Sequence, residues 1–352
     1  MKILVYGAGV VGSFYAARLH EAGNDVSLLA RGRRLEALRT QGVVLEPIGE
    51  GPRASIALDV AESLEPDDAY DLIIVAVRRN HLESVLPALA ANEATPNVLF
   101  LGNNASGPGE HVAALGRSRV LMGFGGVAGV LDGARVRYVS SPHGDHGRTV
   151  VGELDGTFSS RLQRVAQAFE RTSRPIKVER DIDAWLKTHA AVVVPLAHAV
   201  YLAGGDVYRL ARTRDGLVLA VRAVRECFRA MRAQGVAVTP GWFRALEWVP
   251  EPALVAILGR VLRSRRAEFG LAGHANVARD EMRHLAGELE ELIRPANTPT
   301  AALDHLLTFG DADEPPMLDG RAVIPLEWRD VWVSAGALAA ALLLVRHLIP
   351  RG

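Results

Sequence analysis

A glycine-rich turn near the start of the chain, Gly7-Ala8-Gly9-Val10-Val11-Gly12, constrains the fold more than any other part of the sequence. It follows a short apolar run that ends at Tyr6 and opens an amphipathic helical pattern over 11–22. In such a turn the first glycine permits a tight bend, the second lets a pyrophosphate approach the backbone, and the third allows close helix–strand packing. The helix N-terminus then faces the phosphates. In this setting the motif predicts a turn that binds a dinucleotide.

Short strand-like runs alternate with helical patterns over the first hundred residues or so. This alternation indicates a parallel sheet that helices cover on both faces. Three runs rich in β-branched residues follow between 125 and 155, and we expect antiparallel strands there that close the same domain. The expected fold class is α/β with a Rossmann-type, doubly wound N-terminal domain. Its strands are predicted at 2–6, 25–30, 71–77 and 97–101, and its first helices at 11–22 and 34–41.

Beyond about residue 178 the sequence changes to long helical patterns with few strand-like runs. Because 352 residues exceed one ordinary domain, we expect a second, mainly α-helical domain. The predicted limits are 1–178 for the dinucleotide-binding domain, 179–310 for a helical substrate and catalytic domain, and 311–352 for a linker with an apolar C-terminal helix. The helices of the second domain are predicted at 182–202, 216–234, 252–269, 275–293 and 300–307.

The last part of the chain contains fifteen consecutive uncharged residues, 331–345, between Asp330 and Arg346. At about 1.5 Å per residue a helix over them spans roughly 22 Å, which is short of the roughly 30 Å hydrocarbon core of a membrane. The length favours a helix that is buried or that docks weakly on a partner or a membrane surface. A marginal C-terminal membrane anchor is the alternative interpretation.

The end of the second predicted strand separates the two nicotinamide cofactors. NAD-binding domains carry an acidic residue there, which accepts hydrogen bonds from the adenosine ribose, but this chain has Ala30-Arg31-Gly32-Arg33-Arg34. A guanidinium at this point can pair with the 2′-phosphate of NADP in a bidentate, charge-assisted manner. We therefore predict NADP(H) as the cofactor and Arg31 as the residue that binds its 2′-phosphate. The two later arginines either share this role or form the solvated start of a helix.

Composition excludes several other functions. The 40 acidic and 40 basic residues balance, so bulk charge gives no argument for nucleic acid as a partner. The 11 histidines and the single cysteine form no HExxH motif or ligand-spaced cluster, which argues against a metal, and no GxSxG elbow of a hydrolase is present. Because Cys227 can form no internal disulfide and no secretory signal precedes the glycine turn, we expect a cytoplasmic protein, with membrane association through 331–345 as the alternative.

Three segments together resemble the ketopantoate reductase family: MKILVYGAGVVGSFYAARL at the start, the strand that ends in LLARG, and the later WLK. The resemblance spans roughly residues 1–310. It implies an NADPH-dependent enzyme that reduces 2-dehydropantoate, a step of pantothenate biosynthesis, and hence a small carbonyl compound as substrate. A homodimer is one oligomeric state that fits such an enzyme.

The resemblance implies roles for four residues, taken one at a time. Arg78, at the end of DLIIVAVRRN, matches a family lysine that lines the cofactor cleft, and it keeps the charge but not the shape. Asn103 matches an asparagine that contacts both the nicotinamide and the substrate. Lys187 matches the general acid of the family, a role that suits a positioned ammonium because hydride delivery builds negative charge on the carbonyl oxygen. Glu281 matches a glutamate that binds the substrate hydroxyl or tunes Lys187.

Three positions depart from the family pattern, and in the family these are positions expected to determine which substrate is bound. Asn104 replaces a glycine, Ala191 replaces an asparagine that holds the substrate, and Phe269 stands where the family has a serine. Asn104 is either a second substrate contact or part of a turn, because asparagine tolerates left-handed backbone angles. His274 lies near the missing serine in sequence, where an ordinary structural role is expected.

Two classes of function remain for the whole chain. The leading hypothesis is an NADPH-dependent reductase of a small 2-oxo acid, similar to 2-dehydropantoate 2-reductase; the three departures also allow a different, bulkier carbonyl substrate. The rival is a binding protein that senses NADP(H) without turnover. An enzyme requires Lys187, whereas a sensor does not.

Overall fold

The computed structural model describes residues 1–49, 51–139, 148–311 and 313–328. The chain divides into two units, Met1–Val194 with Phe269–Leu292 and Pro195–Glu268 with Ile293–Gly352. The long helix α6 (Ile182–Leu202) begins in the first unit and ends in the second. The boundaries of these two units differ from the domain limits expected from the sequence. Those domain limits stay a prediction. The apolar segment 331–345 lies outside the described residues.

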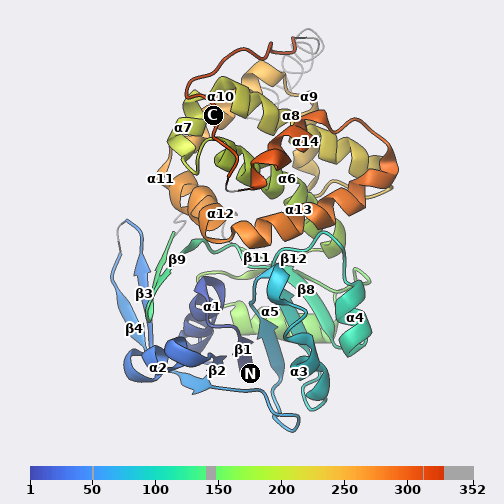
Figure 1. Ribbon diagram of the computed structural model, residues 1–352. Coiled ribbons are helices and arrows are strands. Elements are labelled where there is room, and N and C mark those ends of the chain that lie inside the picture. The colour runs from blue at the N-terminus through green and yellow to red at the C-terminus, as the bar shows by residue number, and fades with distance from the viewer. Residues whose placement is uncertain (50, 140–147, 312, 329–352) are drawn as a thin grey trace, which may run out of the picture. The chain divides into compact units, whose positions relative to one another are not determined.

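Eight strands form the main sheet of the first unit, in the order β12-β11-β8-β7-β6-β1-β2-β5 (Figure 1). Neighbours from β8 to β5 are parallel, whereas β11 runs antiparallel to β8 and parallel to β12. The expected α/β, doubly wound class is therefore confirmed. The strands are β1 (Lys2–Tyr6), β2 (Asp25–Leu29), β5 (Asp59–Ala61), β6 (Leu72–Val75), β7 (Val98–Leu101), β8 (Val120–Phe124), β11 (Thr149–Gly152) and β12 (Ile176–Val178).

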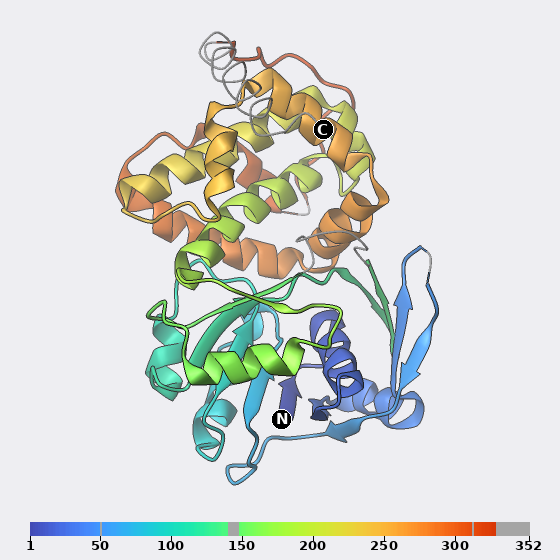
Figure 2. The same cartoon turned by 180° about the vertical axis from the view of Figure 1, so that it is seen from behind.

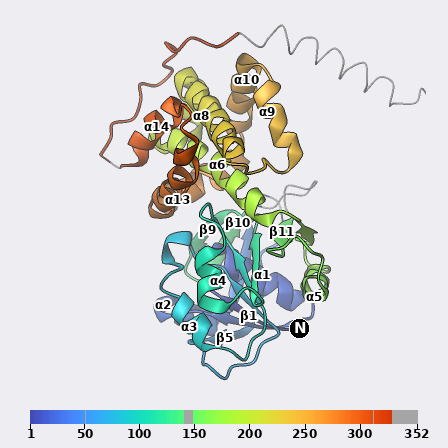
Figure 3. The same ribbon diagram turned by 90° about the vertical axis from the view of Figure 1, so that its right-hand side faces the viewer.

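Both faces of this sheet are buried, which explains why its strands are continuous apolar runs. Alternate residues of β1 join different cores: Ile3 and Val5 belong to one apolar cluster, and Leu4 and Tyr6 to the other. The helices α1 (Val10–Glu21) and α5 (Ser160–Phe169) contribute to the first cluster, and α3 (Leu86–Ala91) and α4 (Gly109–Leu115) to the second. Figure 3 shows these pairs on opposite sides of the sheet, and Figure 2 shows α5 lying along it.

The strand order reverses between β1 and β6. From β1 the chain proceeds through α1 to β2 and, by way of α2 (Gly32–Gln41), on to β5, and it then returns to pair β6 with the other edge of β1. The connections after β1 and β6 therefore leave the sheet on opposite sides, and ligands of doubly wound sheets bind at the carboxyl ends of strands at such a point. The glycine turn follows β1 directly, so it lies at this position.

A second sheet of four strands, in the order β4-β3-β10-β9, is a feature that the sequence did not predict. Of the three runs expected as antiparallel strands, only β11 joins the main sheet; β9 (Gly129–Asp132) and β10 (Arg135–Tyr138) pair with each other. On its other edge β10 runs parallel to β3 (Val43–Pro47), which pairs in turn with β4 (Ala54–Ile56). Apolar contact with α1 accounts for this, since the ring of Tyr138 lies 5.0 Å from that of Phe14.

The described part of the second unit contains helices and connecting segments without strands. Its long helix α8 (Arg214–Ala233) packs against α14 (Ala301–Leu307) and α10 (Glu251–Leu262). Residues 313–328 contain no helix or strand. Among the described residues no helix is both long and apolar enough to cross a membrane. The helices of this unit are α7 (Val207–Arg212), α8 (Arg214–Ala233), α9 (Ala245–Trp248), α10 (Glu251–Leu262), α11 (Arg265–Ala267) and α14 (Ala301–Leu307); α12 (Gly273–Val277) and almost all of α13 (Arg279–Ile293) belong to the first unit.

A buried hydrogen bond between α1 and β11 gives a test of this packing. The hydroxyls of Tyr15 and Thr149 lie 2.7 Å apart, both side chains are inaccessible to solvent, and burial raises the pKa of Tyr15 to about 12. We expect Tyr15→Phe to lower the free energy of unfolding by about 1 kcal/mol, measured by urea titration. Tyr208→Phe is the matched control, because the hydroxyl of Tyr208 bonds Glu268 at the surface; we expect a change below about 0.5 kcal/mol. Equal effects of the two substitutions would contradict the assigned bond.

Candidate active site

Close packing fixes two of the three glycines of the turn. Gly7 has a φ of +113°, and a β-carbon on it would lie 2.7 Å from the carbonyl oxygen of Ala76, just beyond β6. A β-carbon on Gly12 would lie 1.8 Å from the carbonyl oxygen of Gly7. No side chain fits at either position without a shift of the backbone. The turn is therefore pressed against the end of β6, where the strand order reverses.

Gly9 differs from the other two glycines, because a β-carbon on it would meet nothing within 4 Å. It is the N-cap of α1, no side chain caps that helix end, and the first turn contains no acidic residue. The first N–H groups of α1, from Val10 and Val11 onward, have no carbonyl partner within the helix and lie at the positive end of the helix dipole, next to the open space at Gly9. This arrangement fits the pyrophosphate of a dinucleotide.

Arg34 holds the glycine turn in place. Its Nε donates to the carbonyl of Ala8 at 3.0 Å, one terminal nitrogen donates to Ser13 Oγ at 2.7 Å, and the other contacts the carbonyl of Gly133. Burial lowers the pKa of Arg34 to about 10, so the guanidinium stays charged at neutral pH. All three nitrogens have protein partners. Arg34 is thus a structural support of the turn, a role that its arginine-rich sequence context does not reveal.

Arg31 lies two residues after the end of β2 and remains exposed. One of its terminal nitrogens donates to the hydroxyl of Tyr6, the last residue of β1, at 3.0 Å. The guanidinium thereby lies at the carboxyl ends of β1 and β2, beside the glycine turn. Ala30 and Gly32 flank it, so no acidic side chain occupies this strand end. This strand end therefore carries a cation and no acidic side chain.

Arg78, by contrast, points toward the start of α13. Its guanidinium donates to the carbonyl of Val277 at 3.0 Å and contacts Asp280 at 3.4 Å. The Asn80 amide donates to the same carboxylate at 2.8 Å. Desolvation raises the pKa of Asp280, but the bond from Asn80, with smaller contributions from the backbone and from the charge of Arg78, outweighs it and holds the pKa below its usual range. Arg78 is 37% exposed, so it keeps contact with solvent.

Asn103 and Glu281 meet at the end of β7. The Asn103 amide nitrogen donates to Glu281 Oε1 at 2.9 Å, although 178 residues separate them in sequence. Their exposed fractions are 8% and 4%, so the carboxylate is removed from bulk water. The backbone N–H of Arg79 donates to the same oxygen at 3.3 Å. Because a carboxylate only accepts hydrogen bonds, the amide nitrogen of Asn103 must face it, and the amide oxygen Oδ1 faces the other way.

Lys187 lies on α6 beside the loop that follows β7. Its Nζ is 2.5 Å from Asp183 Oδ2, one helical turn earlier, and only 14% of its side chain is exposed. A β-carbon on Gly107 would lie 3.6 Å from Nζ, and Gly107 has a φ of +86°. The loop thus carries Asn103 at one end and contacts Lys187 at the other. Within the described part of the chain, no hydrogen bond or ion pair joins Lys187 to Asn103 or Glu281.

The three positions that depart from the family pattern lie in different surroundings. Asn104 forms a turn with Gly107: its amide nitrogen donates to the carbonyl of Gly107 at 3.1 Å, and its oxygen accepts from the backbone N–H of Gly107 at 2.6 Å. Ala191 is fully buried in α6. Phe269 is half-buried in the π-helical turn Glu268–Ala272. The structure therefore uses Asn104 as a turn residue.

Two histidines, His274 and His189, lie near residues of the candidate site. His274 Nε2 is 3.9 Å from Glu281 Oε2, so a residue for which an ordinary role was expected joins the candidate site. The ring of His189 stacks on Trp185 and lies 4.1 Å from the ring of Phe124. Burial, with a smaller contribution from His274, lowers the pKa of His189 to about 4. His189 is thus a packed, neutral side chain at neutral pH.

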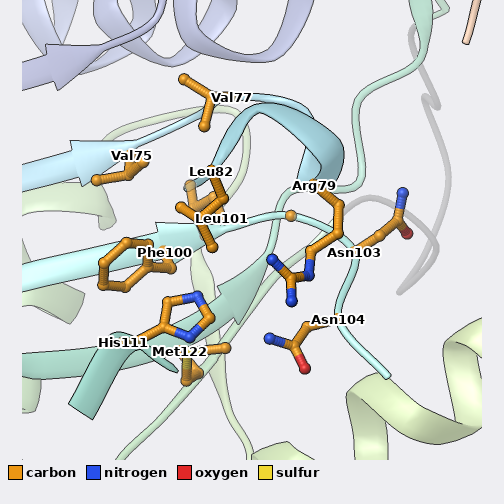
Figure 4. A pocket seen from close by; sticks show the side chains of 11 residues that line it. Val75, Val77, Arg79, Leu82, Phe100, Leu101, Asn103, Asn104, His111 and Met122 are labelled. Atoms are coloured by element: carbon orange, nitrogen blue, oxygen red, sulfur yellow. The ribbon is translucent and has the colours of Figure 1, made fainter. Parts of the chain in front are cut away.

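A small cavity lies behind the loop that follows β7 (Figure 4). Its volume of about 20 Å³ is room for about one water molecule. Val75, Leu82, Phe100 and Met122 form part of its apolar wall, while Arg79, Asn103, Asn104 and His111 supply polar atoms. Burial and the nearby charge of Arg79 lower the pKa of His111 to about 4. Asn103 Oδ1, Arg79 Nε and His111 Nδ1 are buried and have no hydrogen-bond partner among the described residues.

A doubly wound sheet with a glycine turn at the reversal of strand order defines a dinucleotide-binding α/β protein. A family model described as ketopantoate reductase PanE/ApbA matches residues 3–156. The 2-dehydropantoate 2-reductase of Archaeoglobus fulgidus is 30% identical over 212 residues, which cover 59% of this chain and 67% of that protein. The chain belongs to the ketopantoate reductase family, as a divergent member, and the resemblance inferred from its sequence is confirmed.

Two solved structures share the fold at lower identity. D-mandelate dehydrogenase, determined with NADH and anilino(oxo)acetate, has a TM-score of 0.71 and 17% identity, and the match covers 88% of this chain and 97% of that one. The dimeric ketopantoate reductase from Staphylococcus aureus has a TM-score of 0.63 and 16% identity, with 88% and 97% covered. At these identities the likeness is one of fold.

The different surroundings of the glycines give a test of the turn. We expect Gly9→Ala to leave the free energy of unfolding within about 0.5 kcal/mol of the wild type, because its new methyl group meets only open space. The same methyl group should weaken binding of a reduced nicotinamide dinucleotide at least about tenfold, or about 1.4 kcal/mol, measured by nicotinamide fluorescence. Gly109→Ala, also in open space but on α4, is the control and should bind the dinucleotide normally. Gly12→Ala should instead destabilise the fold by about 3 kcal/mol. Unchanged binding by Gly9→Ala would refute the turn as the pyrophosphate site.

Proposed function

We propose that this chain is an NADPH-dependent reductase of a small 2-oxo acid, with a mechanism like that of 2-dehydropantoate 2-reductase. The observation that carries the proposal is the buried contact of 2.9 Å between Asn103 and Glu281 at the carboxyl end of β7. Burial of a carboxylate and an amide costs free energy that an apolar pair of similar size would not cost, and such a polar pair suits a site that binds a polar ligand. Family membership supports the same conclusion.

The cofactor would be held by the turn from Gly7 to Gly12, with its pyrophosphate in front of Gly9 and its adenosine phosphate at Arg31. When bound, NADPH supplies the hydride that reduces the carbonyl carbon. Preference for NADPH over NADH rests on Arg31, which presents its guanidinium where an NAD-binding domain has a carboxylate. Arg78 lies farther along the sheet edge, after β6, and would add positive charge to the same side of the site.

Lys187 is the proposed general acid. Reduction of a carbonyl builds negative charge on its oxygen, and an ammonium at hydrogen-bond distance both stabilises that charge and delivers a proton. The ion pair with Asp183 holds Nζ beside Gly107, on the loop that also carries Asn103. Asn103 would orient the reacting groups, and Glu281 would accept a hydrogen bond, through its remaining lone pairs, from a substrate that carries a hydroxyl, such as 2-dehydropantoate.

The substrate is proposed as a 2-oxo acid, with two candidates of different size. 2-Dehydropantoate follows from the family. Phenylglyoxylate, an aromatic 2-oxo acid, represents the bulkier alternative, which is favoured by the small, apolar Ala191 in place of the family asparagine and by the shared fold with D-mandelate dehydrogenase. Loss of one amide from a pocket changes which substrate oxygens can be bound, so the two acids should be turned over at clearly different rates.

Substitution of Lys187 tests the catalytic assignment. Lys187→Ala should lower kcat for the preferred 2-oxo acid by about 10² to 10⁴, because both the proton donor and the charge are lost. Absorbance of reduced nicotinamide at saturating NADPH measures the rate. Lys187→Arg should recover little, since arginine keeps the charge but does not give up its proton. Lys177→Ala on β12 is the matched control and should retain wild-type activity.

The same variants separate an enzyme from a sensor of NADP(H). An enzyme should show substrate-dependent loss of NADPH in the wild type, and Lys187→Ala should still bind the cofactor. If the wild type binds NADPH but oxidises it with neither 2-dehydropantoate nor phenylglyoxylate nor other 2-oxo acids, the reductase proposal fails and the sensor is favoured. Full activity in Lys187→Ala would refute the role of the lysine alone.

Substitution of Arg31 tests the choice of cofactor. Arg31→Asp should weaken NADPH binding by at least about tenfold, because a carboxylate repels the 2′-phosphate, and it should weaken NADH binding much less. The ratio of the two dissociation constants, from fluorescence titration, is the quantity to compare. Arg39→Asp, an exposed arginine later in α2, is the control for a change of surface charge. A ratio that does not change would exclude Arg31 as the phosphate ligand.

A further inference from the structure

Helix α13 carries two buried carboxylates on one face. Glu281 and Glu288 are seven residues apart, or about two helical turns, so they project to the same side. Only 4% of Glu281 and 8% of Glu288 is exposed to solvent. Buried glutamates require several hydrogen-bond partners to offset their lost hydration. Glu281 finds its partners at the ends of β6 and β7, and Glu288 finds its partners in the loop that follows β7.

Glu288 binds this loop through its backbone as well as through a side chain. Its Oε2 accepts from the backbone N–H of Ala105 at 2.9 Å, and its Oε1 accepts from Ser106 Oγ at 3.2 Å. The neighbouring His284, on the same helix, lies 3.4 Å from Oε1. A carboxylate that accepts a backbone N–H of a loop fixes the path of the loop itself and not only one side chain.

Arg79 supplies the opposite charge. One terminal nitrogen lies 2.5 Å from Glu288 Oε1 and also donates to Ser106 Oγ at 3.0 Å, while the other contacts Glu110 on α4. Only 7% of the Arg79 side chain is exposed. Its backbone N–H is the group that donates to Glu281. Arg79 therefore links the two buried carboxylates of α13, through its backbone to one and its side chain to the other.

The loop 103–107 is thereby held at three points. Asn103 bonds Glu281, Ala105 and Ser106 bond Glu288, and the turn between Asn104 and Gly107 closes the loop on itself. With its nitrogen committed to Glu281, Asn103 presents a buried oxygen that has no partner among the described residues. The direction of that oxygen depends on the position of the loop, and hence on Glu288.

We propose that Glu288, paired with Arg79, is a positioning residue for the reduction. It holds the loop 103–107 so that Asn103 Oδ1 can accept a hydrogen bond from the bound cofactor or substrate. The inference rests on the proposed function, and it assigns to Glu288 no contact with the reacting atoms. A buried ion pair often contributes no more to the free energy of unfolding than a well-packed apolar pair of similar size. A role in positioning the loop therefore explains the presence of these two charges better than stability does.

Glu288→Gln tests the proposal in the full-length protein. Gln keeps the size and one acceptor but removes the charge that pairs with Arg79. We expect kcat with the preferred 2-oxo acid to fall by about 10²-fold, the effect of a misplacement of about 1 Å at a reacting group. The dissociation constant for NADPH should stay within about threefold of the wild type, because the glycine turn and Arg31 are unchanged. Glu290→Gln on the same helix is the matched control and should match the wild type in both quantities.

A double substitution separates positioning from stability. Glu288→Leu alone removes the buried carboxylate that pairs with Arg79 and leaves only the ion pair with Glu110 among the described residues, so its melting temperature should fall. Arg79→Met combined with Glu288→Leu should restore most of that loss. If the pair positions the loop, kcat of the double variant stays low although its melting temperature recovers. Recovery of kcat together with the melting temperature would show a purely structural role and overturn the proposal. A normal kcat in Glu288→Gln would overturn it as well.

Different outcomes refute the reductase proposal and the positioning role of Glu288. If the wild type oxidises NADPH with no 2-oxo acid, the reductase proposal is refuted, and the positioning role falls with it. If the wild type is active and both the Gln variant and the double variant are unimpaired, only the positioning role is refuted.

Discussion

The crowding of three backbone segments at the switch point between β1 and β6 is the constraint on which the site depends. The carbonyls of Ala76 and Gly7 occupy the space where β-carbons of Gly7 and Gly12 would lie. Because this contact leaves no room for side chains, it brings the turn, the first helix and the end of β6 to fixed relative positions. Arg34 completes the arrangement by binding the turn from α2. The open face at Gly9 is what this packing leaves for a ligand.

The other side of the site comes from a distant part of the sequence. Glu281 and Glu288 of α13 bind the segments that follow β6 and β7 through one asparagine, one serine, one arginine and two backbone N–H groups. Buried carboxylates are costly unless they are well paired, so this helix can satisfy them in few arrangements. The polar contacts therefore specify where α13 lies on the first unit. Apolar contacts alone would tolerate small shifts of the helix.

Much of the fold could be predicted because it follows from local patterns. The helix predicted at 182–202 coincides with α6, and the glycine turn identified the first strand and helix. The second sheet could not be predicted, because about ninety residues separate β3 from β10 and no local sequence pattern indicates that these two strands pair. In the same way, Arg79 and Glu288 lie in the runs VRRNH and AGELEEL, where charges are typical of an exposed surface. The roles of Asn103, Lys187 and Glu281 stay predictions that rest on family resemblance.

The hydrogen bond between Asn103 and Glu281 has a consequence for ligand selection. A side-chain amide with no hydrogen bonds can bind either a donor or an acceptor, because it carries both N–H groups and an oxygen. In this protein the amide nitrogen of Asn103 donates to the Glu281 carboxylate, so the acceptor oxygen Oδ1 is the atom that has no partner among the described residues. If a ligand group reaches that oxygen, a hydroxyl or an amide N–H can donate to it, whereas a carboxylate or a ketone oxygen would be repelled. Such an oxygen would orient a molecule that carries donors at one end and acceptors at the other.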